Sequence, residues 1–262
     1  MNQNFWNGKT IVITGTSSGI GEAILNELKE ISCTIFAIDR TTKDIPTSKA
    51  KIVQLQCDLT RSDELEKTGQ EILKQTESVD VLFNNAGITA HGRFDEMKME
   101  VFRKTFEINF FAAVHLTLVL IDKIKKSKGV VIVTSTVSGL YGIPGRSAYS
   151  SSKSALHAAF ESLRIELSEF GVRSIIFCPP YTKTALRTSG LDSKGNKLNE
   201  EQAKGKIKTP KEVAEAMILA VEDKNSRLVT MDKSGFYVKW LRLFAPAFLE
   251  KQLFKKLYHD FH

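Results

Sequence analysis

Residues 10–21, TIVITGTSSGIG, decide the expected fold of this chain. The first five residues, Thr10–Thr14, are all β-branched and predict a buried strand. Glycines and serines follow, and a helical pattern begins near residue 19, so a tight turn should join the strand to a helix. Such a turn lets the backbone approach an anion, which the N–H groups of the helix start can hold. Alone it is a weak signal, because many strand-to-helix turns favour glycine.

Short apolar runs and longer helical patterns alternate along the rest of the chain. Further helical patterns lie near 61–76, 99–126, 148–170 and 210–222. Strands that are apolar on both faces and separated by helices indicate a parallel sheet covered on both sides. The sequence therefore predicts a single-domain α/β fold: a doubly wound parallel sheet of Rossmann type, with about seven strands and helices on both faces. The six further strands are expected at Thr34–Asp39, Ile52–Cys57, Val79–Asn84, Val130–Ser135, Arg173–Cys178 and Arg227–Thr230.

The chain has 262 residues, enough for two domains, but it shows no linker and no internal repeat. The amino terminus, Met1–Lys9, lacks the features of a signal peptide. The longest apolar run, Phe110–Ile121, is too short to span a bilayer and predicts a buried helix. An odd number of widely spaced cysteines favours reduced thiols and a cytoplasmic location. They are Cys33, Cys57 and Cys178.

Two segments depart from this alternation. Residues 187–208 are polar, without a period, and follow the sixth strand, at the sheet edge where ligands bind. We interpret them as a lid on the domain of residues 1–230, and a plain insertion is the alternative. The C-terminal extension, residues 231–262, is amphipathic, and its last thirty residues hold six Lys or Arg against Glu250 and Asp260, a balance of +4. We expect it to pack on the body or on a second subunit, and contact with a membrane surface is a further alternative.

The net charge of +7 is therefore concentrated at the end of the chain, and no nucleic-acid-binding motif accompanies it. The negative charge of Asp39 bears on which cofactor can bind. Asp39 ends the second strand about twenty residues after the glycine turn, where a carboxylate can accept from ribose hydroxyls and repel a 2′-phosphate. Arg40 follows and softens this preference. The pattern favours NAD over NADP and leaves NADP open.

Three further motifs follow the turn in a fixed order. Asn84-Asn85-Ala86-Gly87 closes the fourth strand, Asn109 lies on the next helix, and Tyr149-Ser150-Ser151-Ser152-Lys153 opens the helix after the fifth strand. With the turn at 14–21, they closely resemble the short-chain dehydrogenase/reductase family over about residues 9–230. A Tyr and a Lys four residues apart are common in helices, whereas four motifs in this order are not.

The resemblance implies a catalytic set of Asn109, Thr136, Tyr149 and Lys153. Tyr149 is then the general acid in reduction and the base in oxidation, although a free phenol has a pKa of about 10. Lys153, one helical turn away, is expected to lower that pKa and to hold the nicotinamide ribose. Asn109 is expected to bind a water molecule that relays protons from Lys153. Thr136 stands where the family usually has serine, so it keeps the hydroxyl for the substrate oxygen but adds a methyl group that crowds the site.

Besides Thr136, the sequence departs from the family pattern after the sixth strand. The family usually has Pro-Gly there, and this chain has Pro179-Pro180. We expect the entrance to the substrate pocket to be reshaped there, with Tyr181 projecting into it. The five histidines lack ligand spacing, so no metal site is expected. The residues expected to bind the cofactor are Gly15, Ser17, Ser18, Gly19, Ile20, Gly21, Asp39, Arg40, Asp58, Leu59, Asn85, Ala86, Gly87, Tyr149, Lys153, Pro179, Thr182 and Thr184.

These expectations converge on an oxidoreductase that transfers hydride between nicotinamide and a secondary alcohol or ketone. The lid and the aromatic extension favour a lipophilic substrate, such as a steroid, a retinoid or an acyl-chain carbonyl. The resemblance also implies a homodimer or homotetramer. The alternative is a dinucleotide-binding redox sensor or scaffold without turnover, which Thr136 and Pro180 would favour.

Overall fold

A computed structural model of the chain describes residues 1–184, 186, 190–198 and 207–258. Its seven strands form one sheet in the order β3-β2-β1-β4-β5-β6-β7, and every neighbouring pair is parallel. The strands are β1 (Thr10–Thr14), β2 (Thr34–Asp39), β3 (Lys51–Gln56), β4 (Val81–Asn84), β5 (Val130–Thr134), β6 (Arg173–Cys178) and β7 (Leu228–Thr230). The predicted doubly wound parallel sheet is confirmed, and strand ends differ from the expected ones by at most two residues. The largest difference is at β4, because the N–H of Val79 bonds to the carbonyl of Lys123 and not to a neighbouring strand.

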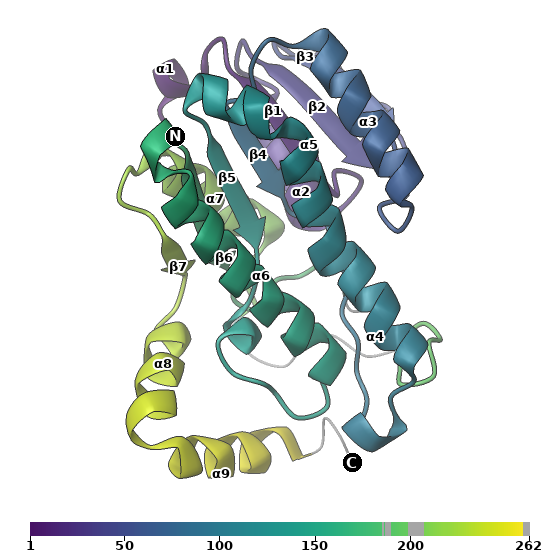
Figure 1. Cartoon of the computed structure of the whole chain (residues 1–262), viewed down its shortest axis with the longest axis vertical. Helices are drawn as coiled ribbons and strands as arrows, with labels where there is room; N and C mark the ends of the chain where they lie inside the picture. Colours follow the sequence, from purple (N-terminus) through teal and green to yellow (C-terminus); the bar gives the residue numbers. More distant parts are fainter. Residues whose placement is uncertain (185, 187–189, 199–206, 259–262) are drawn as a thin grey trace.

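Helices cover both faces of the sheet (Figure 1). One face carries α1 (Gln3–Trp6), α2 (Gly19–Leu28) and α7 (Pro210–Glu222), and the other carries α3 (Ser62–Gln75), α5 (Ala112–Ser127) and α6 (Ser147–Glu166). The two layers follow from strand alternation: Ile11 and Ile13 enter the first core, while Val12 between them enters the second. All three side chains are completely buried, which explains why the strands are apolar on both faces.

The long helix expected at 99–126 consists of three parts. These are α4 (Met99–Phe106), a π turn (Glu107–Phe111) and α5. Together they span Met99–Ser127, which is longer than the apolar run Phe110–Ile121. By length and composition alone, this whole segment could cross a membrane. Leu116 and Leu120 are nevertheless completely buried against the sheet, so α5 forms a layer of the domain core.

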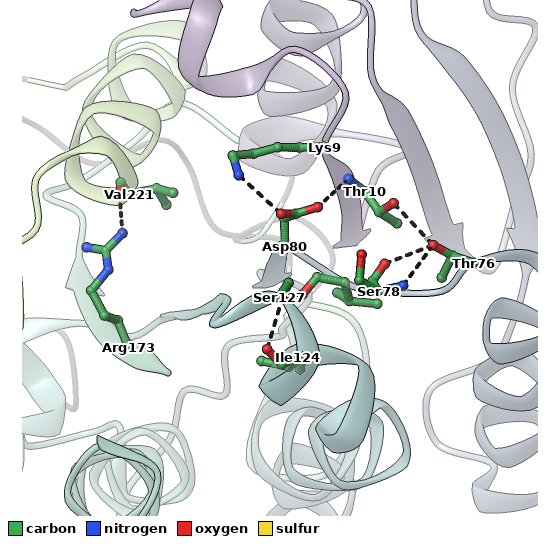
Figure 2. A network of polar contacts seen from close by, with 10 residues as sticks. Lys9, Thr10, Thr76, Ser78, Asp80, Ile124, Ser127, Arg173 and Val221 are labelled. Carbon is green, nitrogen blue, oxygen red and sulfur yellow. Dashed lines mark hydrogen bonds and ion pairs between the residues drawn. The ribbon is translucent and has the colours of Figure 1, made fainter. Parts of the chain in front are cut away.

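A polar network closes the amino-terminal edge of the sheet (Figure 2). The carboxylate of Asp80 accepts from Lys9 Nζ at 3.1 Å and from the N–H of Thr10 at 2.8 Å. Thr10 Oγ1 lies 3.2 Å from Thr76 Oγ1, which donates to the carbonyl of Ser78. These groups bond to one another within the protein. The sequence motifs lie at the opposite, carboxyl edge.

The remaining helices are short or lie at the end of the chain. They are three 3₁₀ turns, at Phe94–Glu96, Val137–Gly139 and Ser168–Phe170, and the helices α8 (Ser234–Phe244) and α9 (Pro246–Leu257). Figure 1 shows α8 and α9 beyond the carboxyl ends of β5 and β6.

Part of the expected lid, residues 187–208, is docked on the body. Leu191 exchanges backbone hydrogen bonds with Thr89 and His91 in the loop after β4, at 2.9 and 2.8 Å. Its side chain is buried against Ala90 and Val101. Residues 187–189 and 199–206 of this segment lie outside the described residues.

Candidate active site

The turn after β1 forms a cradle at the start of α2. Gly15 and Gly19 have φ angles of +77° and +62°, which side chains other than glycine rarely adopt. A Cβ on Gly21 would lie 2.1 Å from the carbonyl oxygen of Gly15, so the third glycine is required by close packing. Ser18 precedes the helix, yet its side chain makes no capping hydrogen bond, and the half-buried Ile20 anchors the helix start to the core. The first N–H groups of α2 therefore have no side-chain cap, which suits binding of a phosphate.

Asp39 ties this cradle to the end of β2. Its carboxylate accepts from the N–H of Ser17 at 2.9 Å and from the N–H of Thr41 at 3.3 Å. Arg40, next in the chain, is exposed. A carboxylate is thus fixed beside the glycine turn, as the spacing of the two motifs predicts.

Asp58 lies beyond the end of β3, beside the half-buried Leu59. Burial alone would raise the pKa of its carboxyl, but two hydrogen bonds from Thr60, at 2.9 and 2.8 Å, outweigh burial and lower it. The charge of Arg40 lowers it further. Asp58 and Arg40 therefore share one surface at the β2–β3 end of the cradle.

The Asn85-Ala86-Gly87 segment joins the ends of three strands. The N–H groups of Asn85 and Ala86 both donate to Thr14 Oγ1 at 3.0 Å. The side chain of Asn85 donates to the carbonyl of Thr14 at 3.2 Å and accepts from Thr134 Oγ1 at 3.1 Å. The carboxyl ends of β1, β4 and β5 are thereby held together.

Gly87 lies where Asn109 and the Tyr149–Lys153 motif come together. A Cβ on Gly87 would lie 3.0 Å from Asn109 Oδ1 and 3.4 Å from Lys153 Nζ. Asn109 lies in the π turn, and its amide accepts from the N–H of Ile88 and donates to the carbonyl of Ile88 and to Ser152 Oγ, at 2.8–3.0 Å. Both amide hydrogens and one lone pair of the amide oxygen are therefore used within the protein.

Lys153 is almost completely buried, and its Nζ donates to the carbonyl of Thr134 at 2.7 Å. Burial lowers the pKa of this ammonium from 10.5 to about 8. The cation is therefore held at the end of β5 with little water around it.

Tyr149 is half-buried, and the hydroxyl of Thr136 lies close enough to its phenol to act on the pKa. Burial raises the pKa of the phenol to about 12, and the charge of Arg146 acts in the opposite direction. The lowered phenol pKa that we expected from Lys153 is thus wrong for the protein alone. Desolvation of the phenol outweighs the charge of Arg146, which is the largest effect in the opposite direction.

The segment after β6 closes the site from the other side. Pro179 and Pro180 are half-buried, and Thr182 Oγ1 donates to the carbonyl of Pro180 at 2.9 Å. The exposed Tyr181 lies near enough to Tyr149 to raise its pKa.

Thr184 belongs to the same segment. A Cβ on Gly19 would lie 3.1 Å from Thr184 Cγ2, so Thr184 stands at the start of α2. The segment therefore reaches from the phenol of Tyr149 to the glycine turn.

Sequence reasoning missed a buried polar group behind this set. His157, one helical turn after Lys153, has its Nε2 2.7 Å from Ser135 Oγ, and burial lowers the pKa of the imidazole to about 4. The thiol of Cys178 lies near Ser135, and burial raises its pKa to about 12. In the sequence, only the position of His157 four residues after Lys153, on the same helix face, marks it as a neighbour of the site.

Comparison with known proteins adds an independent observation. Residues 9–194 match the family model described as short chain dehydrogenase. The chain is 30% identical over 254 residues to a dehydrogenase/reductase SDR family member 7B of Xenopus tropicalis, covering 90% of this chain and 82% of that protein. It is 28% identical to a ketoacyl reductase, HetN, of a Nostoc species, covering 85% and 78%. Its fold matches the crystal structure of a short-chain dehydrogenase from Streptomyces avermitilis with a TM-score of 0.80 and 25% identity, covering 97% and 98%.

Proposed function

The chain belongs to the short-chain dehydrogenase family, and from this premise we propose that it is an NAD(H)-dependent oxidoreductase that interconverts a secondary alcohol and a ketone. The observation that carries the proposal is the proximity of the Thr136 hydroxyl to the phenol of Tyr149, with Lys153 buried one helical turn further on. This supports a site that combines a hydroxyl, a phenol and a cation at the carboxyl edge of the sheet.

Each of these groups has a distinct role in reduction. Thr136 donates to the substrate oxygen and orients it. A phenol with a pKa near 12 is protonated at neutral pH, so Tyr149 can donate its proton to that oxygen as the carbonyl carbon gains hydride. The cations of Lys153 and Arg146 then stabilise the phenolate that is left. In oxidation the same proton returns to the phenolate.

The cofactor proposal rests on the fit of the cradle to a dinucleotide. Uncapped N–H groups at the start of α2 suit the pyrophosphate, and Asp39 suits the hydroxyls of the adenosine ribose. Lys153 would hold the nicotinamide ribose, with Thr184 beside the carboxamide. Bound there, the nicotinamide would supply or accept the hydride and, when oxidised, add positive charge near the phenol. Asp39 supports a preference for NAD(H) over NADP(H).

For the substrate we propose a lipophilic carbonyl compound, such as a steroid, a retinoid or an acyl-chain ketone. Support comes from the exposed apolar side chains that flank the carboxyl edge, among them Tyr181, Trp240 and Phe248. The name of the Nostoc relative, a ketoacyl reductase, is consistent with an acyl-chain carbonyl. Residues 187–208 would serve as the lid over this substrate.

We further propose a homodimer or homotetramer in the cytoplasm. Phe111 and Leu118 on the long helix, and Ile165 on α6, are exposed by 50%, 62% and 73%. Together they supply an apolar face that a second subunit could cover. Cys33, Cys57 and Cys178 are buried free thiols, which suits a reducing compartment.

The experiment that tests the function is a panel of ketones and secondary alcohols assayed with both cofactors, with Tyr149→Phe as the matched variant. Turnover that falls by about a hundredfold or more in Tyr149→Phe, with cofactor binding retained, is expected for loss of the proton donor. Cofactor binding without turnover on any substrate, unchanged in Tyr149→Phe, would instead support the sensor alternative. A preference for NADPH would overturn the cofactor assignment.

A further inference from the structure

The C-terminal extension uses only a small part of its surface to pack on the body. Of its two helices, only Gly235 and Leu249 are buried. Two hydrogen bonds hold it to the loop after β5: Arg242 to the carbonyl of Leu140 at 2.6 Å, and Tyr141 to Glu250 at 2.9 Å. That same loop begins with Thr136, so α8 and α9 stand at the rim of the active site (Figure 1).

The outward faces of α8 and α9 form a concentrated apolar surface. Phe236, Trp240 and Phe244 follow one another along α8: the ring of Trp240 is stacked on Phe244 with centroids 5.2 Å apart and lies tilted against Phe236 at 5.9 Å. All three side chains are at least half exposed. Of the 17 exposed large hydrophobic residues in the described chain, eight lie in residues 236–258. Such a patch on so short a segment marks an interaction surface.

The segment that carries this patch is also rich in cations. Residues 231–258 contain six Lys or Arg against Asp232 and Glu250, which gives +4. Lys251, Lys255 and Lys256 are exposed along α9, beside the half-exposed Phe254. Aromatic rings next to lysines suit the boundary of an anionic bilayer, where the rings enter the headgroup region and the ammonium groups meet lipid phosphates and carboxylates.

A second copy of the chain fits this surface less well. A two-fold contact through this surface would place two copies of residues 231–258, each of charge +4, against one another. Like charges across an interface oppose association, whereas an anionic bilayer supplies the complementary charge.

We propose that α8 and α9 form a peripheral membrane-binding element that docks the enzyme on anionic bilayers, with the rim of its active site at the lipid surface. The substrate then enters from the lipid phase. This last step rests on the proposed function, whereas membrane docking itself does not.

The chain contains its own reporter for the test. It has two tryptophans: Trp6 is completely buried, and Trp240 is 50% exposed at the centre of the patch. Titration of the full chain with phosphatidylcholine vesicles containing phosphatidylserine should shift the emission of Trp240 to shorter wavelength and bring the protein into the vesicle pellet. Phosphatidylcholine alone should bind much more weakly.

Paired variants separate this site from general charge attraction. Lys255→Gln/Lys256→Gln should weaken partition into anionic vesicles by about thirtyfold, because each cation near the surface contributes roughly a factor of five. Lys67→Gln/Lys74→Gln removes the same charge from exposed positions on α3 and should have little effect.

Three results would overturn the inference. One is no binding of the wild type to anionic vesicles, and another is an equal loss of binding in the two paired variants. The third is a concentration-dependent shift of Trp240 emission without vesicles, accompanied by dimer formation, which would assign the surface to a second copy. Binding is measured without substrate, so an inactive protein that still binds vesicles would refute the proposed function alone.

Discussion

The buried ammonium group of Lys153 should lower the free energy of unfolding of the protein. Burial lowers its pKa from 10.5 to about 8 in the folded protein, while the unfolded chain keeps the higher value. Between these two pH values the unfolded chain binds more protons, so the free energy of unfolding rises with pH there. The penalty is fully present below about pH 8 and is lost as pH rises through 10.5. Replacement by methionine, which fills the space without a charge, should remove this pH dependence.

The size of the effect follows from the same two values. Each pKa unit corresponds to about 1.4 kcal/mol, so the difference between 10.5 and about 8 amounts to roughly 3 kcal/mol. Lys153→Met also loses the hydrogen bond to Thr134. Losing this hydrogen bond lowers the free energy of unfolding by a similar amount at every pH. The difference in slope between the two curves of unfolding free energy against pH therefore reports only the cost of the buried charge.

The measurement is urea unfolding of the cofactor-free protein at a series of pH values from below 8 to 10.5. The wild type should gain about 3 kcal/mol relative to Lys153→Met across this range. Lys183→Met, at an exposed position near the site, should follow the wild type. Parallel curves for the wild type and Lys153→Met would refute the reasoning, since the buried ammonium would then carry no cost.

Three other substitutions test neighbouring parts of the site. Gly21→Ala should weaken NADH binding by about tenfold or more in a fluorescence titration, because the new Cβ would lie 2.1 Å from the carbonyl oxygen of Gly15. Gly142→Ala is the control, since a Cβ there would meet nothing within 4 Å. Equal affinities of the two variants for NADH would contradict the role of the glycine turn in cofactor binding. Asp39→Asn should reduce the ratio of kcat/KM for NADH over NADPH by about tenfold, and an unchanged ratio would remove Asp39 from the ribose site. His157→Leu should cost about 1–3 kcal/mol of unfolding free energy by leaving Ser135 Oγ unpaired, whereas His157→Gln should cost less; equal losses would show that the hydrogen bond contributes nothing.

The fold could be predicted almost completely because its signals are local and repeated. Seven β-branched or apolar runs alternate with helical patterns, and each buried strand face is visible in the sequence itself. The strand ends were less predictable, since Val79 has strand composition but bonds to the end of α5. Such a choice depends on which backbone happens to lie alongside, and no local pattern records that.

The site was predicted to the extent that its residues belong to ordered motifs. Gly15, Asn85, Asn109, Tyr149 and Lys153 lie within one connected set of contacts at the carboxyl edge, although their catalytic and binding roles remain proposals. The direction of the Tyr149 pKa shift was wrong, because spacing along a helix says which charges are near but not how much water has been removed. Arg146 and His157 were missed as partners for the same reason.

The π turn at Glu107–Phe111 makes the length of this segment as strict a requirement as its composition. A π turn holds one residue more than an α-helical turn. The wide turn takes up the extra residue, so deletion of one residue from it would restore a regular helix with α4 and α5 in nearly the same relative orientation. The wide turn that presents Asn109 would be lost, and with it the contacts of Asn109 with Ile88 and Ser152. In descendants of this gene, insertions and deletions should therefore be tolerated far less here than substitutions at the exposed positions of the same helix.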